Sequence, residues 1–168
     1  EALTWLRARH ADGGLPLLRL PERRDDIATI LGYATLLRGN TSDVVFLGTG
    51  GSSLGGQTLA QLAGHAIPGV GLLRDPPRVH FMDNLDPDSF ATLLQRLPLG
   101  TARFVAVSKS GGTGETLMQT IAALDAVSSA KLDPHDHFLG ISEPAKPGKK
   151  NGLRELLAPH EIPVMDHD

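Results

Sequence analysis

Short apolar runs recur along the chain, separated by longer segments in which apolar residues repeat at helical spacing. The runs occupy residues 44–47, 79–82, 104–107, 138–141 and 162–165. Because a strand buried on both faces is apolar throughout, such runs are typical of parallel sheets that carry helices on each side. Their alternation with helical segments predicts an α/β fold, a three-layer αβα sandwich around a five-stranded parallel, doubly wound sheet.

The segments between the runs predict helices, with glycine and proline marking the turns. The expected helices are a short piece around Leu3, Trp5 and Leu6, then residues 21–37, 87–97, 115–130 and 153–157. Pro21 suits a first helical turn, and Asp86 is the expected N-cap of the third helix. In the fourth, Leu117, Ile121 and Leu124 lie at helix-compatible spacing. Residues 76–77 and 145–150 are expected to be loops.

Length and organisation indicate one domain with a helical lead-in. The 168 residues are enough for a sizeable core. We assign residues 1–40 to the lead-in and residues 41–168 to the sheet domain. The chain begins with Glu1 and stops directly after its last apolar run, so we expect it to be a portion of a longer protein.

Charge and composition argue against several classes of partner. The net charge is −3, and basic residues adjoin only at positions 23–24 and 149–150, which predicts no nucleic-acid partner. No apolar run has the length of a bilayer span and no signal peptide opens the chain. We therefore expect no membrane partner and a cytoplasmic location. The absence of cysteine excludes disulfides and thiolate metal sites.

The turn after residues 104–107 has the composition of an anion site. It reads SKSGGTGET, and five of its nine positions carry a hydroxyl or amine donor: Ser108, Lys109, Ser110, Thr113 and Thr116. Where a strand leads through a glycine-rich turn into a helix, free backbone N–H groups and the positive end of the helix dipole converge. Capping the helix would need only one hydroxyl. We therefore interpret this turn as an anion-binding site.

A second glycine-rich turn follows residues 44–47 and reads GTGGSSLGG. It lacks the third glycine of a dinucleotide fingerprint, because Ser53 occupies that position, and no Gly-Lys-Ser/Thr of a P-loop occurs. A nucleotide site is thus disfavoured. In doubly wound sheets, ligands bind beyond the carboxyl ends of strands, where the strand order reverses. Two such turns together favour a ligand site over a purely structural turn.

A cluster of histidines and aspartates raises the alternative of a metal site. Asp133, His135, Asp136 and His137 precede the fourth apolar run. Adjacent strand residues point to opposite faces, and we expect these side chains to be solvated loop residues and not ligands. His167 lies beside Asp166 and Asp168, and we assign it no role.

Together, GTGGSSLGG and SKSGGTGET resemble the glucose-6-phosphate isomerase family. The chain is similar to the first of that family's two sugar-isomerase (SIS) domains, which implies a flavodoxin-like sheet. The segment at residues 83–87, Asp-Asn-Leu-Asp-Pro, is also similar to the family's segment at the end of the next strand. The resemblance covers most of the chain, with specific motifs in the two turns.

The resemblance implies a set of substrate-binding residues. Those matched to the family's phosphate-binding and pocket-lining positions are Gly51, Ser52, Ser108, Lys109, Ser110, Thr113 and Thr116. For Lys109, the backbone N–H is the expected contact.

For the whole enzyme, the resemblance implies reversible isomerisation of glucose 6-phosphate and fructose 6-phosphate, in glycolysis and gluconeogenesis, by a homodimer without metal or cofactor. The family's glutamate base, histidine and lysine are expected beyond Asp168, so we predict no catalytic residue in this chain. We expect the chain alone to bind sugar phosphate weakly and to turn nothing over.

Three alternatives share parts of this pattern. A non-catalytic sugar-phosphate sensor module would share the SKS turn, although the GTGGSSLGG turn favours the isomerase. An isomerase or amidotransferase domain acting on amino sugars would use the same fold. A fusion of transaldolase with isomerase would differ only in upstream sequence.

Overall fold

The computed structural model describes residues 1–65 and 77–167, and the chain divides into two compact units, Glu1–Gly39 and Asn40–Asp168. The first unit contains α1 (Ala2–Asp12), the 3₁₀ helix η1 (Pro16–Glu22) and α2 (Ile27–Arg38). The predicted helix at residues 21–37 is therefore wrong at its start. Pro21 lies inside η1, which ends at Glu22, and α2 begins only at Ile27.

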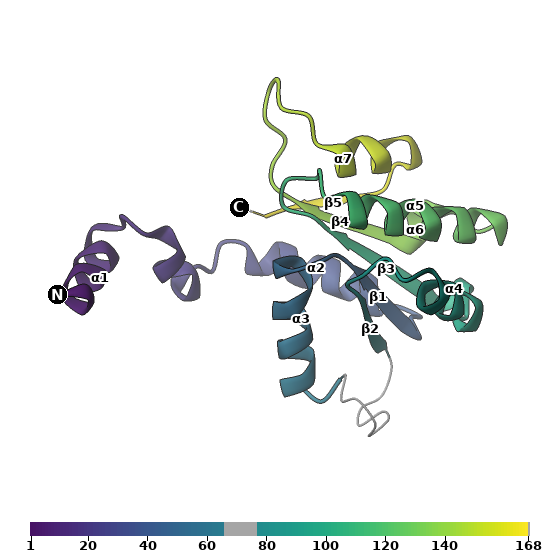
Figure 1. The fold of residues 1–168 in the computed structure, drawn as a ribbon, viewed down its shortest axis with the longest axis horizontal. Helices are drawn as coiled ribbons and strands as arrows, with labels where there is room; N and C mark the ends of the chain where they lie inside the picture. Colours follow the sequence, from purple (N-terminus) through teal and green to yellow (C-terminus); the bar gives the residue numbers. More distant parts are fainter. Residues whose placement is uncertain (66–76, 168) are drawn as a thin grey trace. The chain divides into compact units, whose positions relative to one another are not determined.

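The second unit is built around one parallel sheet of five strands, which confirms the predicted fold class (Figure 1). Its strands are β1 (Asp43–Leu47), β2 (Arg78–Met82), β3 (Ala102–Val107), β4 (Phe138–Ser142) and β5 (Val164–Asp166). The strand order is β2-β1-β3-β4-β5. The last strand begins at Val164 and not at residue 162, because Pro163 has no N–H to donate to a ladder.

Helices cover both faces of this sheet and complete the three layers. The remaining elements are α3 (Gly51–Leu62), α4 (Pro87–Arg96), η2 (Leu99–Thr101), α5 (Gly114–Ser129), α6 (Pro134–His137), α7 (Gly152–Leu157) and η3 (Ala158–His160). On one face, Phe81 stacks on Phe46 and lies against Gly56 of α3. On the other face, Val45 and Phe104 pack in one core with residues of α5 and α7.

The buried face of α5 differs from the apolar stripe that the sequence suggests. Ile121 is half exposed, whereas Thr116, Gln119 and Thr120 are buried. Local and long-range bonds satisfy part of this polarity: the Thr120 hydroxyl donates to the Thr116 carbonyl over 2.6 Å, and the Gln119 amide donates to the Asn84 carbonyl over 2.7 Å. The helix is thus tied to the end of β2 by polar groups that a hydrophobic pattern does not identify.

The expected cap and loops agree with the structure where it describes them. Asp86 is the N-cap of α4, and its carboxylate accepts from the Ser89 N–H over 2.9 Å. Residues 145–150 contain no helix or strand, and Pro76 of the other expected loop lies outside the described residues. Among the helices of the described ranges, none combines the length and apolar character that crossing a bilayer requires.

The strand order places a switch point between β1 and β3. These two strands are neighbours, yet β1 continues through α3 to β2 on one side while β3 continues through α5 to β4 on the other (Figure 1). Crossovers of one hand that run in opposite directions leave a crevice at the carboxyl ends of such strands. In this chain the two glycine-rich turns follow the strands on either side of that switch point.

Candidate anion-binding site

The two glycine-rich turns adjoin at the carboxyl edge of the sheet. Leu47 is paired in register with Ala106, so β1 and β3 end side by side. A Cβ atom built on Gly48 would lie 3.0 Å from the Val107 carbonyl oxygen. Glycine at this position therefore allows the β1–α3 turn (residues 48–50) to approach the β3–α5 turn (residues 108–113) closely.

The β1–α3 turn passes directly into the first residues of α3. Gly50 is the N-cap and has φ +54°, a conformation that glycine adopts without the strain other residues would suffer. It supplies no side chain to cap the helix. Gly51 and Ser52 follow in the first turn, at the positive end of the helix dipole. Both predicted residues therefore lie at this edge of the sheet.

The β3–α5 turn brings most of its predicted donors together. Thr113 is the N-cap of α5, but its side chain makes no capping bond. Instead its hydroxyl accepts from the Ser108 hydroxyl over 3.1 Å. Ser110 is exposed, and its hydroxyl accepts from the Gly112 N–H over 3.3 Å. The hydroxyls therefore do not serve as helix caps, which was the alternative interpretation of this turn.

Thr116 and Lys109 lie apart from this group in different ways. Thr116 is fully buried in the first turn of α5, and its hydroxyl has no hydrogen-bond partner among the described residues. The Lys109 side chain is exposed, whereas its backbone carbonyl is held by Ser142 and Glu143. A buried hydroxyl without a partner is rare in native structures and calls for an explanation.

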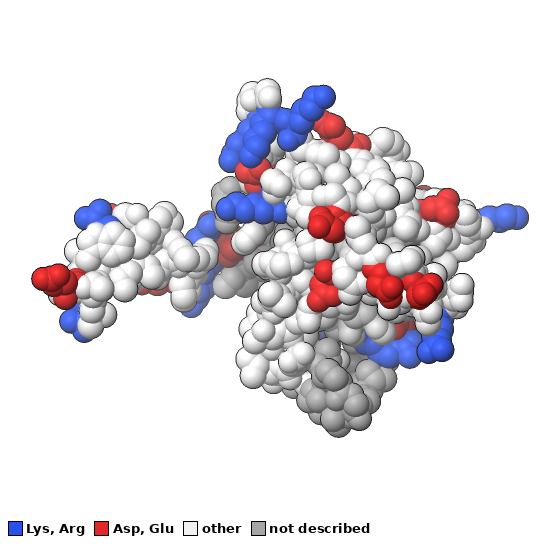
Figure 2. Space-filling model, in the orientation of Figure 1, with Lys and Arg blue, Asp and Glu red and all other residues white. Residues whose placement is uncertain are grey.

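Positive charge gathers beside the turn, over the loop between β4 and α7 (Figure 2). Lys146 and Lys149 of this loop both bind the carboxylate of Glu143. Hydrogen bonds from Lys149 and then Lys146 hold the pKa of Glu143 below its ordinary value. The negative charge of this carboxylate is therefore compensated by the two lysines and does not oppose an anion at the turn.

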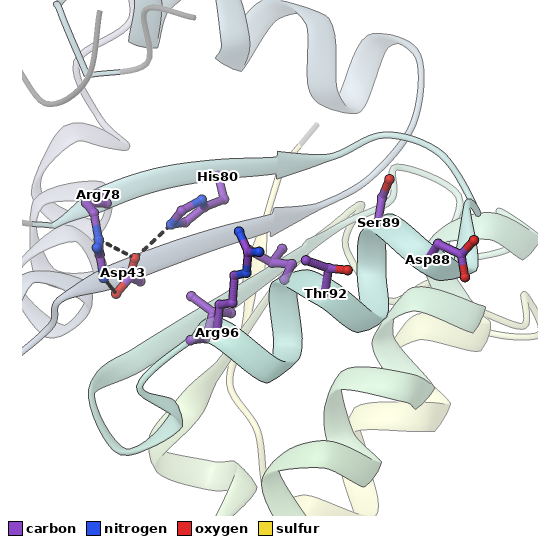
Figure 3. Close-up of a pocket in the computed structure, with 9 residues that line it drawn as sticks. Asp43, Arg78, His80, Asp88, Ser89, Thr92 and Arg96 are labelled. Atoms are coloured by element: carbon purple, nitrogen blue, oxygen red, sulfur yellow. Dashed lines mark hydrogen bonds and ion pairs between the residues drawn. The ribbon is translucent and has the colours of Figure 1, made fainter. Parts of the chain in front are cut away.

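A cavity of about 570 Å³ lies away from the two turns, along β2 and α4 (Figure 3). The Asp43 carboxylate lies at one end, where it accepts hydrogen bonds from Nε and Nη2 of Arg78 and lies 2.7 Å from Nε2 of His80. Burial alone would raise the pKa of Asp43, but the bonds from Arg78 and His80 outweigh it and lower that pKa. No residue of the two turns lines this cavity.

The two histidines of the cluster near residue 135 contact different backbone carbonyls. His135 lies 2.8 Å from the Glu161 carbonyl, and His137 lies 2.9 Å from the Ala102 carbonyl. The expectation that all of these are solvated loop residues is wrong for His137, which is buried at the end of α6. The short helix arises because Asp133 caps it and Pro134 opens it.

Two residues at this edge, Ser142 and Asn151, could not be identified from the two motifs. The Ser142 hydroxyl donates to the Ser108 carbonyl over 2.8 Å, and the Asn151 amide donates to the Ser142 hydroxyl over 2.9 Å. A helix-capping signal was available for Asn151, which precedes the apolar segment of α7 and accepts from the Arg154 N–H. No local signal marks Ser142.

Sheet order, switch point and adjoining turns define an α/β protein with a candidate anion site at the β1/β3 switch point. The sequence profile of the phosphoglucose isomerase family matches residues 31–156. The chain therefore belongs to the phosphoglucose isomerase family, as the two motifs indicate.

Individual relatives agree with this assignment. A glucose-6-phosphate isomerase of Treponema pallidum is 39% identical over 111 residues, 66% of this chain and 20% of the relative. A probable glucose-6-phosphate isomerase of Haloquadratum walsbyi is 29% identical over 94% of this chain and 33% of its own length. The chain thus spans about a fifth to a third of these curated relatives.

Solved structures show the same fold. A hypothetical protein of Thermus thermophilus matches with a TM-score of 0.71 and 27% identity, over 98% of this chain and 37% of that one. A glucose-6-phosphate isomerase of Chlamydia trachomatis matches with a TM-score of 0.64 and 24% identity, over 81% of this chain and 24% of that one.

Proposed function

We propose that this chain supplies the sugar-phosphate-binding part of a glucose-6-phosphate isomerase. The observation that carries the proposal is the junction of the two turns, with neither N-cap residue capping its helix through a side chain. A phosphate dianion at this point would meet unpaired amides and the positive ends of two helix dipoles. We assign the binding to residues 41–168, with residues 1–40 as a helical lead-in.

The proposed donors would contact one phosphate and the sugar attached to it. They are Gly51, Ser52, Ser108, Lys109, Ser110, Thr113 and Thr116, with Lys109 contributing its backbone N–H. Thr116 is the deepest of them. Its buried hydroxyl lacks a partner among the described residues, and a bond to phosphate would recover the roughly 1–3 kcal/mol that such a group costs.

The activity proposed for the complete enzyme is aldose–ketose isomerisation between glucose 6-phosphate and fructose 6-phosphate, in glycolysis and gluconeogenesis. A carboxylate would move a proton between C1 and C2 through an enediol. In that reaction this chain has a positional role: holding the phosphate fixes the sugar against the base. We name no catalytic residue in the chain, and we propose a cytoplasmic homodimer that binds no nucleic acid.

The experiment is a titration of the ¹⁵N-labelled chain followed by NMR. Glucose 6-phosphate and 6-phosphogluconate should shift the amides of residues 51–52 and 108–116 in a saturable manner, and unphosphorylated glucose should not. Ser108→Ala and Thr113→Ala should each weaken binding about tenfold, because each removes a bond to a charged group. Turnover of glucose 6-phosphate by the chain alone would contradict the positional role.

A matched control uses a hydroxyl at the far end of the same helix. Ser128 is exposed near the end of α5, and Ser128→Ala should leave the affinity unchanged. Competition between glucose 6-phosphate and glucosamine 6-phosphate then tests the sugar preference. Tighter binding of the amino sugar would favour the amidotransferase-type alternative over the proposed isomerase.

A further inference from the structure

Three carbonyl groups of the β3–α5 turn, those of Ser108, Lys109 and Gly111, accept hydrogen bonds from one neighbouring segment. The Ser108 carbonyl accepts from the Ser142 hydroxyl over 2.8 Å. The Lys109 carbonyl accepts from the same hydroxyl over 3.2 Å and from the Glu143 N–H over 3.0 Å. The Gly111 carbonyl accepts from the Leu153 N–H over 2.9 Å. These donors belong to the segment that runs from β4 to α7, and the Ser108 carbonyl also accepts from the Gly111 N–H of its own turn over 3.3 Å.

This arrangement fixes where the amides of the turn point. The carbonyl of one residue and the N–H of the next share a planar trans peptide unit and point in opposite directions. The N–H groups of Lys109, Ser110 and Gly112 are therefore turned away from the β4–α7 segment. Within the described residues, the N–H groups of Lys109 and Ser110 have no acceptor. Successive free amides of this kind form a concavity for an anion.

Ser142 and Asn151 hold the arrangement from behind. Ser142 is buried, and its hydroxyl receives the Asn151 amide over 2.9 Å while it donates to the turn. Asn151 also occupies the space beside Gly111, where an added Cβ would lie 1.8 Å from the Asn151 Oδ1 atom. Gly111 has φ +68°, so the turn is shaped to receive this side chain.

We propose that Ser142 and Asn151 are positioning residues for phosphate binding: they hold the carbonyls of the β3–α5 turn and thereby present the Lys109 and Ser110 amides to the ligand. This inference rests on the proposed function for the identity of the ligand. It adds two residues that lie behind the turn and touch the phosphate only through it.

The test compares three variants in the same ¹⁵N-labelled chain, with glucose 6-phosphate as the probe. Ser142→Ala removes the donor to both carbonyls and should weaken binding about tenfold, the effect expected of one lost hydrogen bond. Asn151→Ser keeps a residue that caps α7 well but is too short to reach Ser142, and should weaken binding about threefold. Ser142→Thr retains the hydroxyl and should restore most of the affinity.

A readout without ligand separates this inference from the proposed function. In the ligand-free chain, Ser142→Ala should shift the Lys109 and Ser110 amide resonances and accelerate their hydrogen exchange, and Ser142→Thr should not. Asp133→Ala, which removes the cap of α6, is the control for a general loss of stability and should change neither amide.

The possible results are distinct. If the unaltered chain does not bind glucose 6-phosphate but the amides respond as expected, the proposed function fails and the orienting role stands. If the unaltered chain binds and Ser142→Ala binds equally well with unchanged amide resonances, the inference is overturned.

Discussion

Polar groups differ between the amino edge of the sheet, where the strands begin, and its carboxyl edge, where they end. At the amino edge, Asp43 is buried against Arg78 and His80, and the Ser42 hydroxyl lies 2.7 Å from the Thr101 hydroxyl. At the carboxyl edge, the Lys109 and Ser110 N–H groups of the β3–α5 turn have no acceptor within the described residues. Polar groups that satisfy one another stabilise a fold, whereas donors left open are available to a ligand.

This contrast predicts that substitutions at the amino edge change stability and that substitutions at the carboxyl edge change binding. The following predictions test that separation.

The largest effect is expected for Asp43→Ala. It leaves the Arg78 and His80 side chains without their shared carboxylate, and should lower the free energy of unfolding by about 2–3 kcal/mol, less than a fully buried pair because Arg78 is partly exposed. Urea unfolding followed by circular dichroism measures this loss. The affinity of the folded chain for glucose 6-phosphate should not change, and a tenfold loss would refute the separation of the two edges.

The matched control is Asp25→Ala, which removes a carboxylate bound to Arg23 in an exposed ion pair. Exposed pairs contribute little to stability, so the unfolding midpoint should stay where it is. A loss equal to that of Asp43→Ala would show that burial is not the reason for the effect at Asp43.

The second prediction concerns acid. The folded pKa of Asp43 is lowered, so its contribution to stability is present above the ordinary aspartate pKa of about 3.9 and is lost as the pH falls through the folded value. Unfolding free energies measured from pH 7 downward should therefore decline more steeply for the unaltered chain than for Asp43→Asn. Parallel curves would assign the acid sensitivity to other carboxylates.

The third prediction concerns Thr116, where one substitution should change stability and binding in opposite directions. Thr116→Val keeps the shape of the side chain and removes a buried hydroxyl without a partner among the described residues. The free energy of unfolding should rise by about 1 kcal/mol, while the affinity for glucose 6-phosphate falls several-fold. Thermal unfolding and the NMR titration measure the two quantities on one sample. An unchanged affinity would remove Thr116 from the proposed site.

The smallest effect is expected at a helix that begins at the carboxyl edge but is capped. Asp86 caps α4, and Asp86→Ala should lower the melting temperature by a few degrees. Because this N-terminus is already satisfied, binding of glucose 6-phosphate should be unaffected. Weakened binding would indicate that α4 takes part in the site.

Much of the fold could be predicted because each strand contains part of a short apolar run, and the central strands β1, β3 and β4 are largely buried. The hydrophobic pattern does not identify the buried polar residues of α5, which are Thr116, Gln119 and Thr120. Proline accounts for two errors in element boundaries: Pro21 belongs to a 3₁₀ helix, and Pro163 delays the last strand.

The candidate site could also be predicted only in part. Its turns could be recognised because their glycines, hydroxyls and lysine are contiguous in the sequence. The support from Ser142 could not, because 34 positions separate this residue from Ser108, whose carbonyl it holds. Contacts of that range are created by the pairing of β3 with β4, and no local pattern records them.

The bond between Ser142 and the Ser108 carbonyl has a consequence for protein engineering. A designer who transplanted only the nine residues of SKSGGTGET into another α/β scaffold would carry over the hydroxyls and leave the peptide planes free to rotate. The smallest transferable unit is discontinuous and includes the end of β4 and the start of α7. A graft with both pieces should capture phosphate where the contiguous peptide alone does not.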